Sequence, residues 1–307
     1  MARLAVDPAV LAGAGVGLIG VGEGLGPAVA VLSAAYNANT GQDFAGVMFG
    51  RHYQDAGRGI MKSVAAGINA LLRTGYGVQV SAVNYSRAEA NSDLSRRAQQ
   101  LESPPCPVDV SAPAAPSPLG GGVGEPALWA VVELLVGDLW PNGSPAQMRT
   151  AAASWRSFAS VLYGISGDVS APYNTVAAQE IPEAESIKSV IREIEGVFGQ
   201  LAMASEALAT AVEGFAADVE NTQNAIRRLL ARLGSIGAIV GMFFEFVRGH
   251  GEEELHEIAA DIRTVLDHLK SEADAKKAMF DQALRDLAAW NQAMQIAADR
   301  EFREFFV

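Results

Sequence analysis

Apolar residues recur at alternating intervals of four and three residues through residues 183–233. The fold predicted for the rest of the chain follows from this stretch. A four–three repeat of this length is typical of a helix that supercoils gently against partner helices. About 50 residues at 1.5 Å each form a rod of roughly 75 Å, which cannot bury its apolar stripe alone. The rest of the chain is therefore expected to supply long helices. The seam consists of Ile187, Ile191, Ile194, Phe198, Leu201, Ser205, Leu208, Val212, Phe215, Val219, Thr222, Ile226, Leu229 and Leu233, with only Ser205 and Thr222 polar.

The start of the chain predicts a first helical hairpin, assigned to residues 1–101. Asp7 before Pro8 is typical of a helix start, because the carboxylate caps the first turn and proline fits the first helical position. A glycine-rich helix is expected from there to about residue 37, with a flexible segment as the alternative. After a turn, a second helix is expected to begin at Phe44 or Gly50 and to end near residue 100, with an exposed polar part from Ser86 onward.

Residues 102–126 predict a linker, because proline and glycine accumulate there and neither helices nor strands accept them. A second hairpin follows over residues 127–250. Its apolar segment at residues 127–139 is followed by Ser144-Pro145, another cap before a proline, and a helix is expected from there to about Tyr173. The long heptad helix over residues 183–233 comes next, and residues 251–307 are expected to form a C-terminal helix that packs on the bundle. The fold class is all-α: an elongated bundle of two helical hairpins plus that helix.

Composition agrees with closely packed helices, since half of the residues are hydrophobic and only 7% are aromatic. The net charge of -12 argues against a nucleic-acid surface, which needs clustered Lys and Arg. No signal peptide is recognised, and no segment is a convincing membrane span. The best candidate span, residues 233–247, carries Glu245 and falls short of about 20 residues, so a buried helix or helix junction is favoured.

No catalytic or metal-binding pattern is recognised in the chain. The four histidines are isolated from one another and from cysteine, so no metal site is expected. The glycines of residues 13–26 lack the preceding strand that a dinucleotide loop requires, and no Ser, Cys or Lys lies in a nucleophile's setting. The chain is therefore predicted to be no enzyme and to bind no cofactor.

One short motif stands out near the predicted end of the second helix. Tyr85 and Glu89 lie four residues apart and so share one helix face. Such a spacing also arises by chance as a solvated pair, and the motif alone is a weak signal.

Together with the hairpin pattern, this motif resembles the WXG100 (ESX) family of type VII secretion substrates. More closely, the chain resembles the N-terminal regions of mycobacterial channel proteins that end in a necrosis-inducing toxin. The resemblance runs in the same order over nearly the whole chain. It is carried by Leu4-Ala5-Val6-Asp7-Pro8-Ala9, Phe49-Gly50-Arg51 with Tyr53, Asn84-Tyr85-Ser86 with Ala88-Glu89-Ala90 and Ser92-Asp93, Trp140-Pro141-Asn142-Gly143, Ala151-Ala152-Ala153 with Trp155-Arg156-Ser157, Ile181-Pro182-Glu183-Ala184, and Glu254, Ile258-Ala259 and Asp261-Ile262.

The resemblance implies a secretion-targeting and protein-interaction module of an ESX-secreted polymorphic toxin. It implies a small WXG100 heterodimer and the ESX secretion ATPase as partners, a downstream C-terminal toxin domain, and Tyr85 and Glu89 as the secretion signal. It also implies secretion by the type VII system, with the cell surface or outer membrane as a further location. The NAD-hydrolysing toxin domain of the family is not in these 307 residues.

A strict Trp-x-Gly turn is missing, which is a departure from the family pattern. Phe44-Ala45-Gly46 has the spacing of the Trp-x-Gly turn, with Phe in place of Trp. Phe49-Gly50 is the alternative candidate for this turn. The residues expected at turns or partner contacts are Phe44, Gly46, Phe49, Gly50, Trp140, Gly143 and Trp155. If the two hairpins pack antiparallel, Tyr85 should lie near the turn of the second hairpin, at residues 172–182, and form a composite signal there.

Two other interpretations stay open. The first is an outer-membrane channel or pore-forming domain that translocates the C-terminal toxin, against which charges recur on the long helices. The second is a coiled-coil scaffold in which Tyr85 and Glu89 have no role. Leakage of liposomes would separate the channel from the secretion module.

Overall fold

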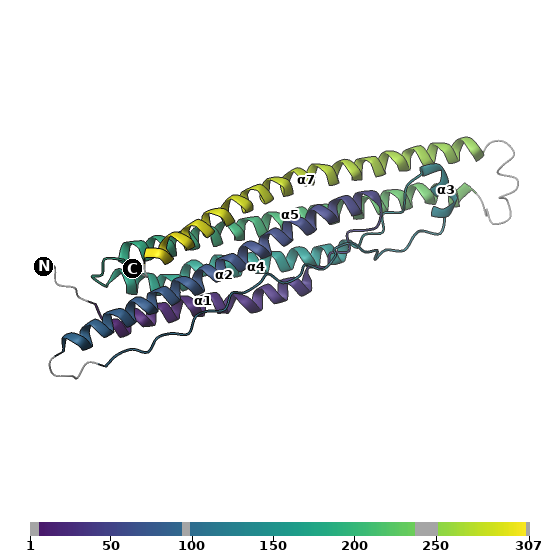
Figure 1. The fold of residues 1–307 in the computed structure, drawn as a ribbon. Helices are drawn as coiled ribbons and strands as arrows, with labels where there is room; N and C mark the ends of the chain where they lie inside the picture. Colours follow the sequence, from purple (N-terminus) through teal and green to yellow (C-terminus); the bar gives the residue numbers. More distant parts are fainter. Residues whose placement is uncertain (1–5, 94–98, 237–250, 305–307) are drawn as a thin grey trace.

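The computed structural model describes residues 6–93, 99–236 and 251–304. Within these ranges the chain is helical and contains no strand, which confirms the predicted all-α class. The long helices lie side by side in an elongated bundle, and the short α3 lies at one end of it (Figure 1). The helices are α1 (Pro8–Ala35), α2 (Phe44–Ser92), α3 (Trp129–Val136), α4 (Pro145–Ala177), α5 (Ala184–Ile236) and α7 (Gly251–Glu304).

The helix starts follow the capping residues that the sequence predicts. The Asp7 carboxylate accepts hydrogen bonds from the backbone N–H groups of Ala9 and Val10, and the Ser144 hydroxyl accepts one from Gln147. Phe44, rather than Gly50, begins α2, because the Asp43 side chain caps this helix through the N–H of Gly46. These side chains satisfy backbone donors that a helix start leaves unpaired.

Two predicted helix ends are wrong by several residues. The expected end of α4 near Tyr173 is too early, because α4 continues through Pro172 to Ala177. Pro172 is buried, and its ring lies 3.0 Å from where a β-carbon on Gly17 would be, so packing against α1 offsets the missing backbone hydrogen bond. The expected end of α2 near residue 100 is too late, since the helix ends at Ser92.

The predicted heptad seam of α5 is confirmed as the buried stripe of that helix. Its residues are 0–5% exposed, except Leu229, which is half-buried beside the buried Leu230. Ser205 is fully buried, and its hydroxyl donates to the Leu201 carbonyl at 2.8 Å. The hydroxyl of this polar seam residue thus has its hydrogen-bond acceptor within its own helix.

The two hairpins pack antiparallel to each other. The turn of the first hairpin lies at the start of α4, where the Ser144 N–H donates to the Asn39 carbonyl at 2.9 Å. The start of α1 lies at the α4–α5 turn, where the Asp7 N–H donates to Gln179 Oε1 at 2.8 Å. Helix α7 packs on both hairpins through α2 and α5. One continuous core therefore runs through α1, α2, α4, α5 and α7.

A second, smaller core closes the α3 end of the bundle. Trp129, Val132 and Val136 of α3 pack with Trp140 against the end of α5 and the start of α7. The rings of Trp129 and Trp140 meet edge to face, with centroids 5.7 Å apart. The side chains of residues 234–252 lie outside the described residues, and with them most of the apolar stretch that ends at Val247.

The predicted linker is an ordered strap, defined here as residues 99–126, that runs along the first hairpin (Figure 1). Asn69 of α2 pairs with both backbone groups of Val110, at 3.0 and 2.7 Å. Arg73 forms an ion pair with Asp109 at 2.5 Å, both side chains being exposed. The Ser33 hydroxyl donates to the Ala114 carbonyl at 2.9 Å. The strap therefore returns along the bundle while bonded to both α1 and α2.

Among the described residues, one helix is long and apolar enough to cross a membrane, judged by length and composition. This helix is α1, whose most apolar window has a mean hydropathy of 1.6. The best candidate span named from the sequence was residues 233–247, for which a buried helix was favoured; of these, residues 237–247 lie outside the described part. The apolar stretch of α1 was not considered as a candidate, since glycines and Glu23 interrupt it.

Candidate functional site

Tyr85 lies near the end of α2, where both hairpins meet. Its ring is half-buried against the core, and its hydroxyl donates to Glu183 Oε2 at 2.8 Å. Glu183 directly precedes α5, in the turn between α4 and α5. The expected closeness of Tyr85 to the turn of the second hairpin is therefore confirmed. Desolvation, followed by the hydrogen bond and charge of Glu183, raises the pKa of Tyr85, so its hydroxyl keeps its proton and donates.

Glu89 lies one helical turn beyond Tyr85 and is exposed. Its backbone carbonyl accepts the N–H of Asp93 at 3.0 Å, which closes the end of α2. Its carboxylate has no hydrogen bond or ion pair to another side chain within the described ranges. Tyr85 is thus fixed by the second hairpin, while Glu89 is available to a partner from the same helix face.

The strap holds this end of α2 in place. Ser86 is buried, accepts the N–H of Leu101 at 2.9 Å and donates to the Gln99 carbonyl at 3.1 Å. The prediction of a solvent-exposed segment from Ser86 onward is therefore wrong at Ser86, because the chain folds back over it. Arg87 adds a hydrogen bond to Ser103 at 2.9 Å. We call Tyr85, Glu89 and Glu183, together with these strap contacts, the composite tip.

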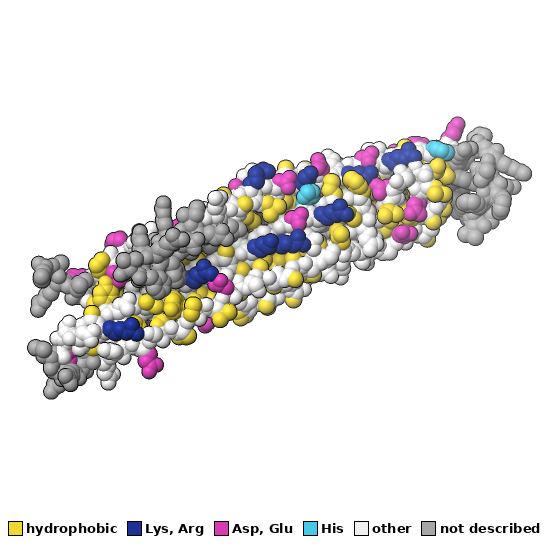
Figure 2. Space-filling view, viewed as in Figure 1, with side chains coloured by type: hydrophobic (Ala, Val, Ile, Leu, Met, Phe, Trp, Pro, Cys, Tyr) yellow, Lys and Arg dark blue, Asp and Glu magenta, His cyan; other side chains and the backbone are white. Residues whose placement is uncertain are grey.

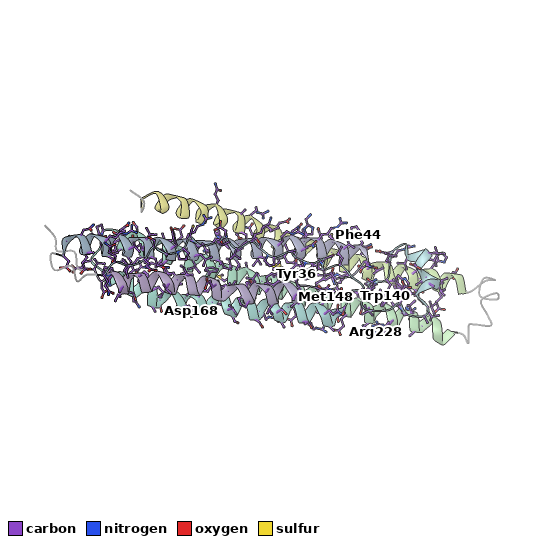
Figure 3. All side chains as sticks on the ribbon, turned by 60° about the horizontal axis from the view of Figure 1, so that its bottom comes forward. Tyr36, Phe44, Trp140, Met148, Asp168 and Arg228 are labelled. Carbon is purple, nitrogen blue, oxygen red and sulfur yellow. The ribbon has the colours of Figure 1, made fainter. Side chains whose placement is uncertain are left out.

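The other predicted residues gather at a second place, where the two hairpin turns meet the strap. The Thr40 N–H donates to the Pro118 carbonyl at 2.9 Å, and the Gly41 N–H donates to Gly120 at 3.0 Å. The Gln42 N–H donates to Asn142 Oδ1 at 2.8 Å. We call residues 39–43, 118–123 and 140–144 the turn junction. In Figure 3, Tyr36, Met148 and Trp140 follow one another along this part of the bundle toward α3.

Most of the residues expected at turns or partner contacts contact other parts of this chain. Gly46, Phe49, Gly50, Trp140, Gly143 and Trp155 are buried. Phe44 is the exception at 60% exposed, with the Lys270 ammonium 5.8 Å from its ring centroid. Gly46 has a steric reason, since a β-carbon there would lie 2.5 Å from the Thr40 carbonyl oxygen. That any of these residues contacts a partner protein stays a prediction.

Gln223 of α5 is a structural residue that the sequence analysis missed. It is 3% exposed, and its amide donates to the carbonyls of Pro141 and Gly143 at 2.7 and 2.9 Å. It therefore satisfies two buried acceptors of the turn junction at once. Its position three residues before Ile226 on the seam gives no sign of this role, because the acceptors lie about 80 residues away in sequence.

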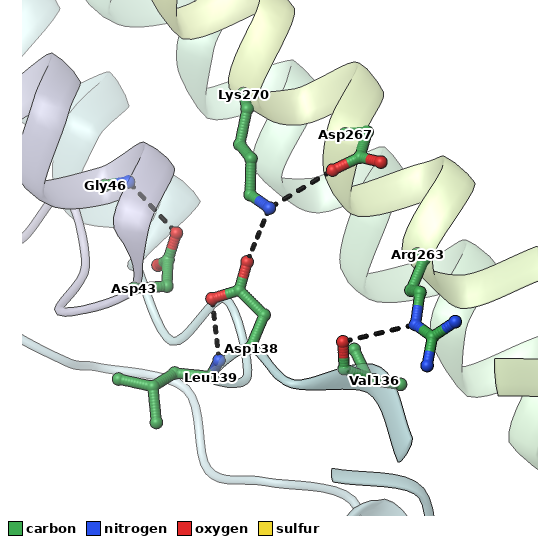
Figure 4. Close-up of polar contacts among 8 residues, drawn as sticks. All are labelled: Asp43, Gly46, Val136, Asp138, Leu139, Arg263, Asp267 and Lys270. Carbon is green, nitrogen blue, oxygen red and sulfur yellow. Dashed lines mark hydrogen bonds and ion pairs between the residues drawn. The ribbon is translucent and has the colours of Figure 1, made fainter. Parts of the chain in front are cut away.

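Asp43 is a buried carboxylate in the turn junction. It is 4% exposed and accepts the N–H of Gly46 at 3.0 Å (Figure 4). Burial raises the pKa of Asp43 to about 6, the backbone N–H of Gly46 opposes this rise, and the nearby Asp138 adds to it. The Lys270 ammonium lies in the same region and forms ion pairs with Asp138 at 2.9 Å and with Asp267 at 3.2 Å. The site thus combines an α2 cap with a carboxylate that is costly to ionise.

Stability is expected to depend on pH through Asp43. Because its folded pKa lies above the unfolded value, the stabilising contribution is fully present below about pH 4 and is lost as pH rises through about 6. Relative to Asp43→Asn, the wild-type free energy of unfolding should fall by about 1–3 kcal/mol across that window. Urea denaturation of both proteins between pH 4 and 7 measures the difference. Parallel pH profiles would contradict the assignment.

No group of three or more His, Cys, Asp or Glu side chains could hold a metal ion within the described ranges. The face drawn in Figure 2 shows Lys and Arg interspersed with Asp and Glu along the bundle. That the chain is no enzyme and takes no cofactor stays a prediction.

Comparison with known proteins gives relatives over nearly the whole chain. Residues 114–249 match the family of WXG100-like domains, a range that includes α3, α4 and α5. The outer membrane channel protein CpnT is 35% identical over 277 residues, both in Mycobacterium bovis (strain BCG / Pasteur 1173P2) and in Mycobacterium tuberculosis (strain ATCC 25618 / H37Rv). The alignment covers 89% of this chain and 33% of CpnT.

A further relative is Mav of Mycobacterium avium (strain 104), a protein named for an NAD(+)–arginine ADP-ribosyltransferase activity. It is 32% identical over 313 residues, which cover 99% of this chain and 38% of Mav. The chain thus spans about a third of the length of these curated relatives. No solved structure matches the chain significantly.

Proposed function

Because this chain is homologous to the N-terminal region of CpnT and carries a WXG100-like domain, we propose that it is the secretion-targeting and protein-interaction module of a type VII (ESX) secreted toxin. Its partners are then a small WXG100 heterodimer, the ESX secretion ATPase and a C-terminal toxin domain. On this proposal it is secreted by the type VII system and does no catalysis itself. On the same proposal, the ADP-ribosyltransferase chemistry in the name of Mav lies outside the 38% of Mav that aligns with this chain.

The observation that carries this proposal is the composite tip. Tyr85 and Glu89 share one face of α2, and Glu183 of the other hairpin fixes the Tyr85 hydroxyl at 2.8 Å. A half-buried aromatic ring beside an exposed carboxylate offers both an apolar and a charged contact at the end of a rigid rod. A partner that reads this end would contact both hairpins, so it would recognise the folded chain.

Replacing Tyr85 or Glu89 should abolish export and leave the fold intact. We expect Tyr85→Ala and Glu89→Ala to reduce the exported fraction of the full-length protein at least tenfold, because the tip loses its aromatic or its charged contact. The measurement compares the amounts in culture filtrate and cells. Tyr163→Ala is a matched control, since Tyr163 is an exposed tyrosine of α4 whose hydroxyl also meets a glutamate, Glu206, at 3.5 Å.

Circular dichroism and thermal unfolding of each variant establish that the bundle still folds. Normal export of both Tyr85→Ala and Glu89→Ala would overturn the role of the tip. Loss of export in Tyr163→Ala to the same degree would show that the assay responds to general damage. Co-expression with a small WXG100 pair, followed by light scattering, tests the partner: a stable complex supports it, and a free monomer contradicts it.

A second candidate function is an outer-membrane channel that translocates the toxin domain. The relative CpnT is an outer membrane channel protein by name, which favours this function, as does the apolar character of α1. Long helices with charges on their exposed faces argue against a lipid-exposed bundle. Dye release from liposomes by the purified chain separates the two functions, because a secretion module releases no dye.

A further inference from the structure

The four helices of the two hairpins form four grooves between neighbouring helices. Helix α1 packs on α2, α2 on α5, α5 on α4, and α4 on α1. The strap is bonded to both helices of the α1–α2 groove, and α7 fills the α2–α5 groove. Ion pairs bridge α4 and α5, from Arg149 to Glu220 and from Arg156 to Glu213. Within the described part of the chain, the α1–α4 groove has neither a covering segment nor such a bridge.

The α1–α4 groove is open and apolar, with a volume of about 440 Å³. The hydroxyls of Thr150 and Ser154, which belong to its lining, donate to carbonyls of their own helix. The surface stays open farther along both helices, because β-carbons at Gly24 of α1 and Gly164 of α4 would meet no atom within 4 Å. The larger side chains of the lining are Pro27, Val31, Phe158 and Val161.

Helix α7 shows how a helix fills a groove of this bundle. Its apolar stripe is 0–3% exposed and joins the core with α2 and α5. Leu284 of α7 lies 2.8 Å from where a β-carbon on Gly59 of α2 would be, so a glycine allows the close approach. Lys276 of α7 pairs with Asp218 of α5 at 2.6 Å. An apolar stripe with a lysine opposite an acidic residue thus holds α7 in place. The stripe consists of Leu269, Ala273, Phe280 and Leu287.

The α1–α4 groove also has acidic residues beside it, one on each helix. Glu23 lies four residues before Pro27 and therefore shares its face of α1. Asp168 lies seven residues after Val161 and four before Pro172, so it shares their face of α4. In Figure 3, Asp168 lies along α4 toward the end of the bundle that carries the composite tip.

Glu23 and Asp168 lie at nearly the same level of the bundle. Gly17 of α1 faces Pro172 of the antiparallel α4, and the two acidic residues lie six and four residues from this contact. At about 1.5 Å per residue, their levels differ by about 3 Å. Both are exposed, and neither has a hydrogen bond or ion pair to another side chain of the described residues. This groove therefore has acidic residues without the lysine that α7 brings to the other groove.

We propose that the α1–α4 groove binds one amphipathic helix of the small helical partner. The apolar stripe of that helix lies in the groove, and one of its Lys or Arg side chains pairs with Glu23 and Asp168. A helix bound in a groove uses apolar residues at i, i+4 and i+7 as anchors, as α7 does with Leu269, Ala273 and Phe280. The inference rests on the proposed function, since the partner is the small WXG100 heterodimer named there, and it adds the surface where that partner binds.

A second copy of this chain is the competing occupant of the groove. A two-fold axis through this face would place the acidic residues of both copies, Glu23 and Asp168, in one interface. Helix α1 contains no Lys or Arg, and Arg149 and Arg156 of α4 are paired with α5. The net charge of -12 on each copy adds repulsion. A partner with a basic residue removes this repulsion and adds a charge-assisted hydrogen bond.

Titration calorimetry of the full chain with the purified small WXG100 pair tests the proposal. Val31→Glu and Val161→Glu, at positions 68% and 42% exposed, should each weaken binding at least tenfold, because each places a charge in the apolar groove. Glu23→Lys and Asp168→Lys should each weaken binding several-fold, because they repel the basic residue of the partner. Wild-type binding should also weaken several-fold at high salt.

Two variants of α5 are matched controls, and both should bind the pair as the wild type does. Met203→Glu changes an apolar residue that is 62% exposed and lies outside the groove. Glu193→Lys reverses an exposed acidic residue that, like Glu23, has no side-chain partner among the described residues. Circular dichroism and thermal unfolding establish that every variant folds.

Four results would overturn the proposal. Wild-type affinity in all four groove variants would place the pair elsewhere and leave the proposed function intact. An equal loss of binding in the control variants would show that the groove has no special role. Concentration-dependent self-association of the pure chain that Val31→Glu abolishes would assign the groove to a second copy. No binding of the pair to wild-type protein would exclude this partner as well, while the export of the Tyr85 and Glu89 variants would still decide the role of the composite tip.

Discussion

Replacing Trp155 with alanine is expected to lower the free energy of unfolding by about 3–5 kcal/mol, the range for deleting a fully buried large aromatic side chain. The Trp155 ring is 0% exposed and lies edge to face with Tyr36, centroids 5.9 Å apart. Its Nε1–H donates to the Tyr53 hydroxyl at 2.8 Å. Tyr53 in turn stacks on Tyr36 at 4.7 Å. The alanine variant thus leaves a cavity where α1, α2 and α4 meet.

Urea denaturation measures this loss as a lower midpoint at an unchanged slope. Trp155→Phe separates packing from hydrogen bonding, because phenylalanine fills part of the space and lacks the donor. It should cost about 1–3 kcal/mol, less than alanine. A loss below about 1 kcal/mol for Trp155→Ala would mean that the three helices do not share this core in solution.

Gln223→Leu is expected to lower the free energy of unfolding by about 2–4 kcal/mol, because two buried carbonyls lose their donor at once. The acceptors are the Pro141 and Gly143 carbonyls, which the amide reaches at 2.7 and 2.9 Å. Leucine has a similar volume, so the change removes hydrogen bonds and leaves little cavity. Hydrogen exchange should also show faster exchange of the amide of Ser144, which belongs to the same turn.

Gln282→Leu is the matched control for this change. Gln282 is exposed on α7, and its side-chain amide donates to Asp286 at 2.9 Å and accepts a hydrogen bond from Arg285 at 2.7 Å. Its replacement should change stability by less than about 0.5 kcal/mol. Equal stability of the two leucine variants would exclude Gln223 as a support of the turn junction.

The sequence predicted those parts of the fold that depend on local pattern. The four–three seam of α5 identified the buried stripe because a helix face repeats in sequence as it does in space. Asp7 and Ser144 identified helix starts for the same reason, since a cap acts on the next few residues. Pro172 was a local signal that misled, because its contact with Gly17 of α1 overrides the tendency of proline to end a helix.

Contacts between residues distant in sequence were predictable only where the hairpin pattern fixed them. The closeness of Tyr85 to the second turn followed from the antiparallel arrangement of two hairpins of similar length. Glu183 as its acceptor did not follow, because several acidic residues near that turn fit equally well. Gln223 and the hydrogen bonds of the strap were not predictable either, since their partners are backbone groups, which every residue carries.

Because the strap joins the two hairpins covalently, it determines how they find each other after synthesis. Two separate helical hairpins would pair to an extent set by their dissociation constant and by the level of each chain. Here residues 99–126 join them, so the second hairpin meets the first at an effective concentration on the order of millimolar, whatever the level of expression. The stoichiometry is fixed at one to one, and no unpaired hairpin with an exposed seam accumulates to aggregate.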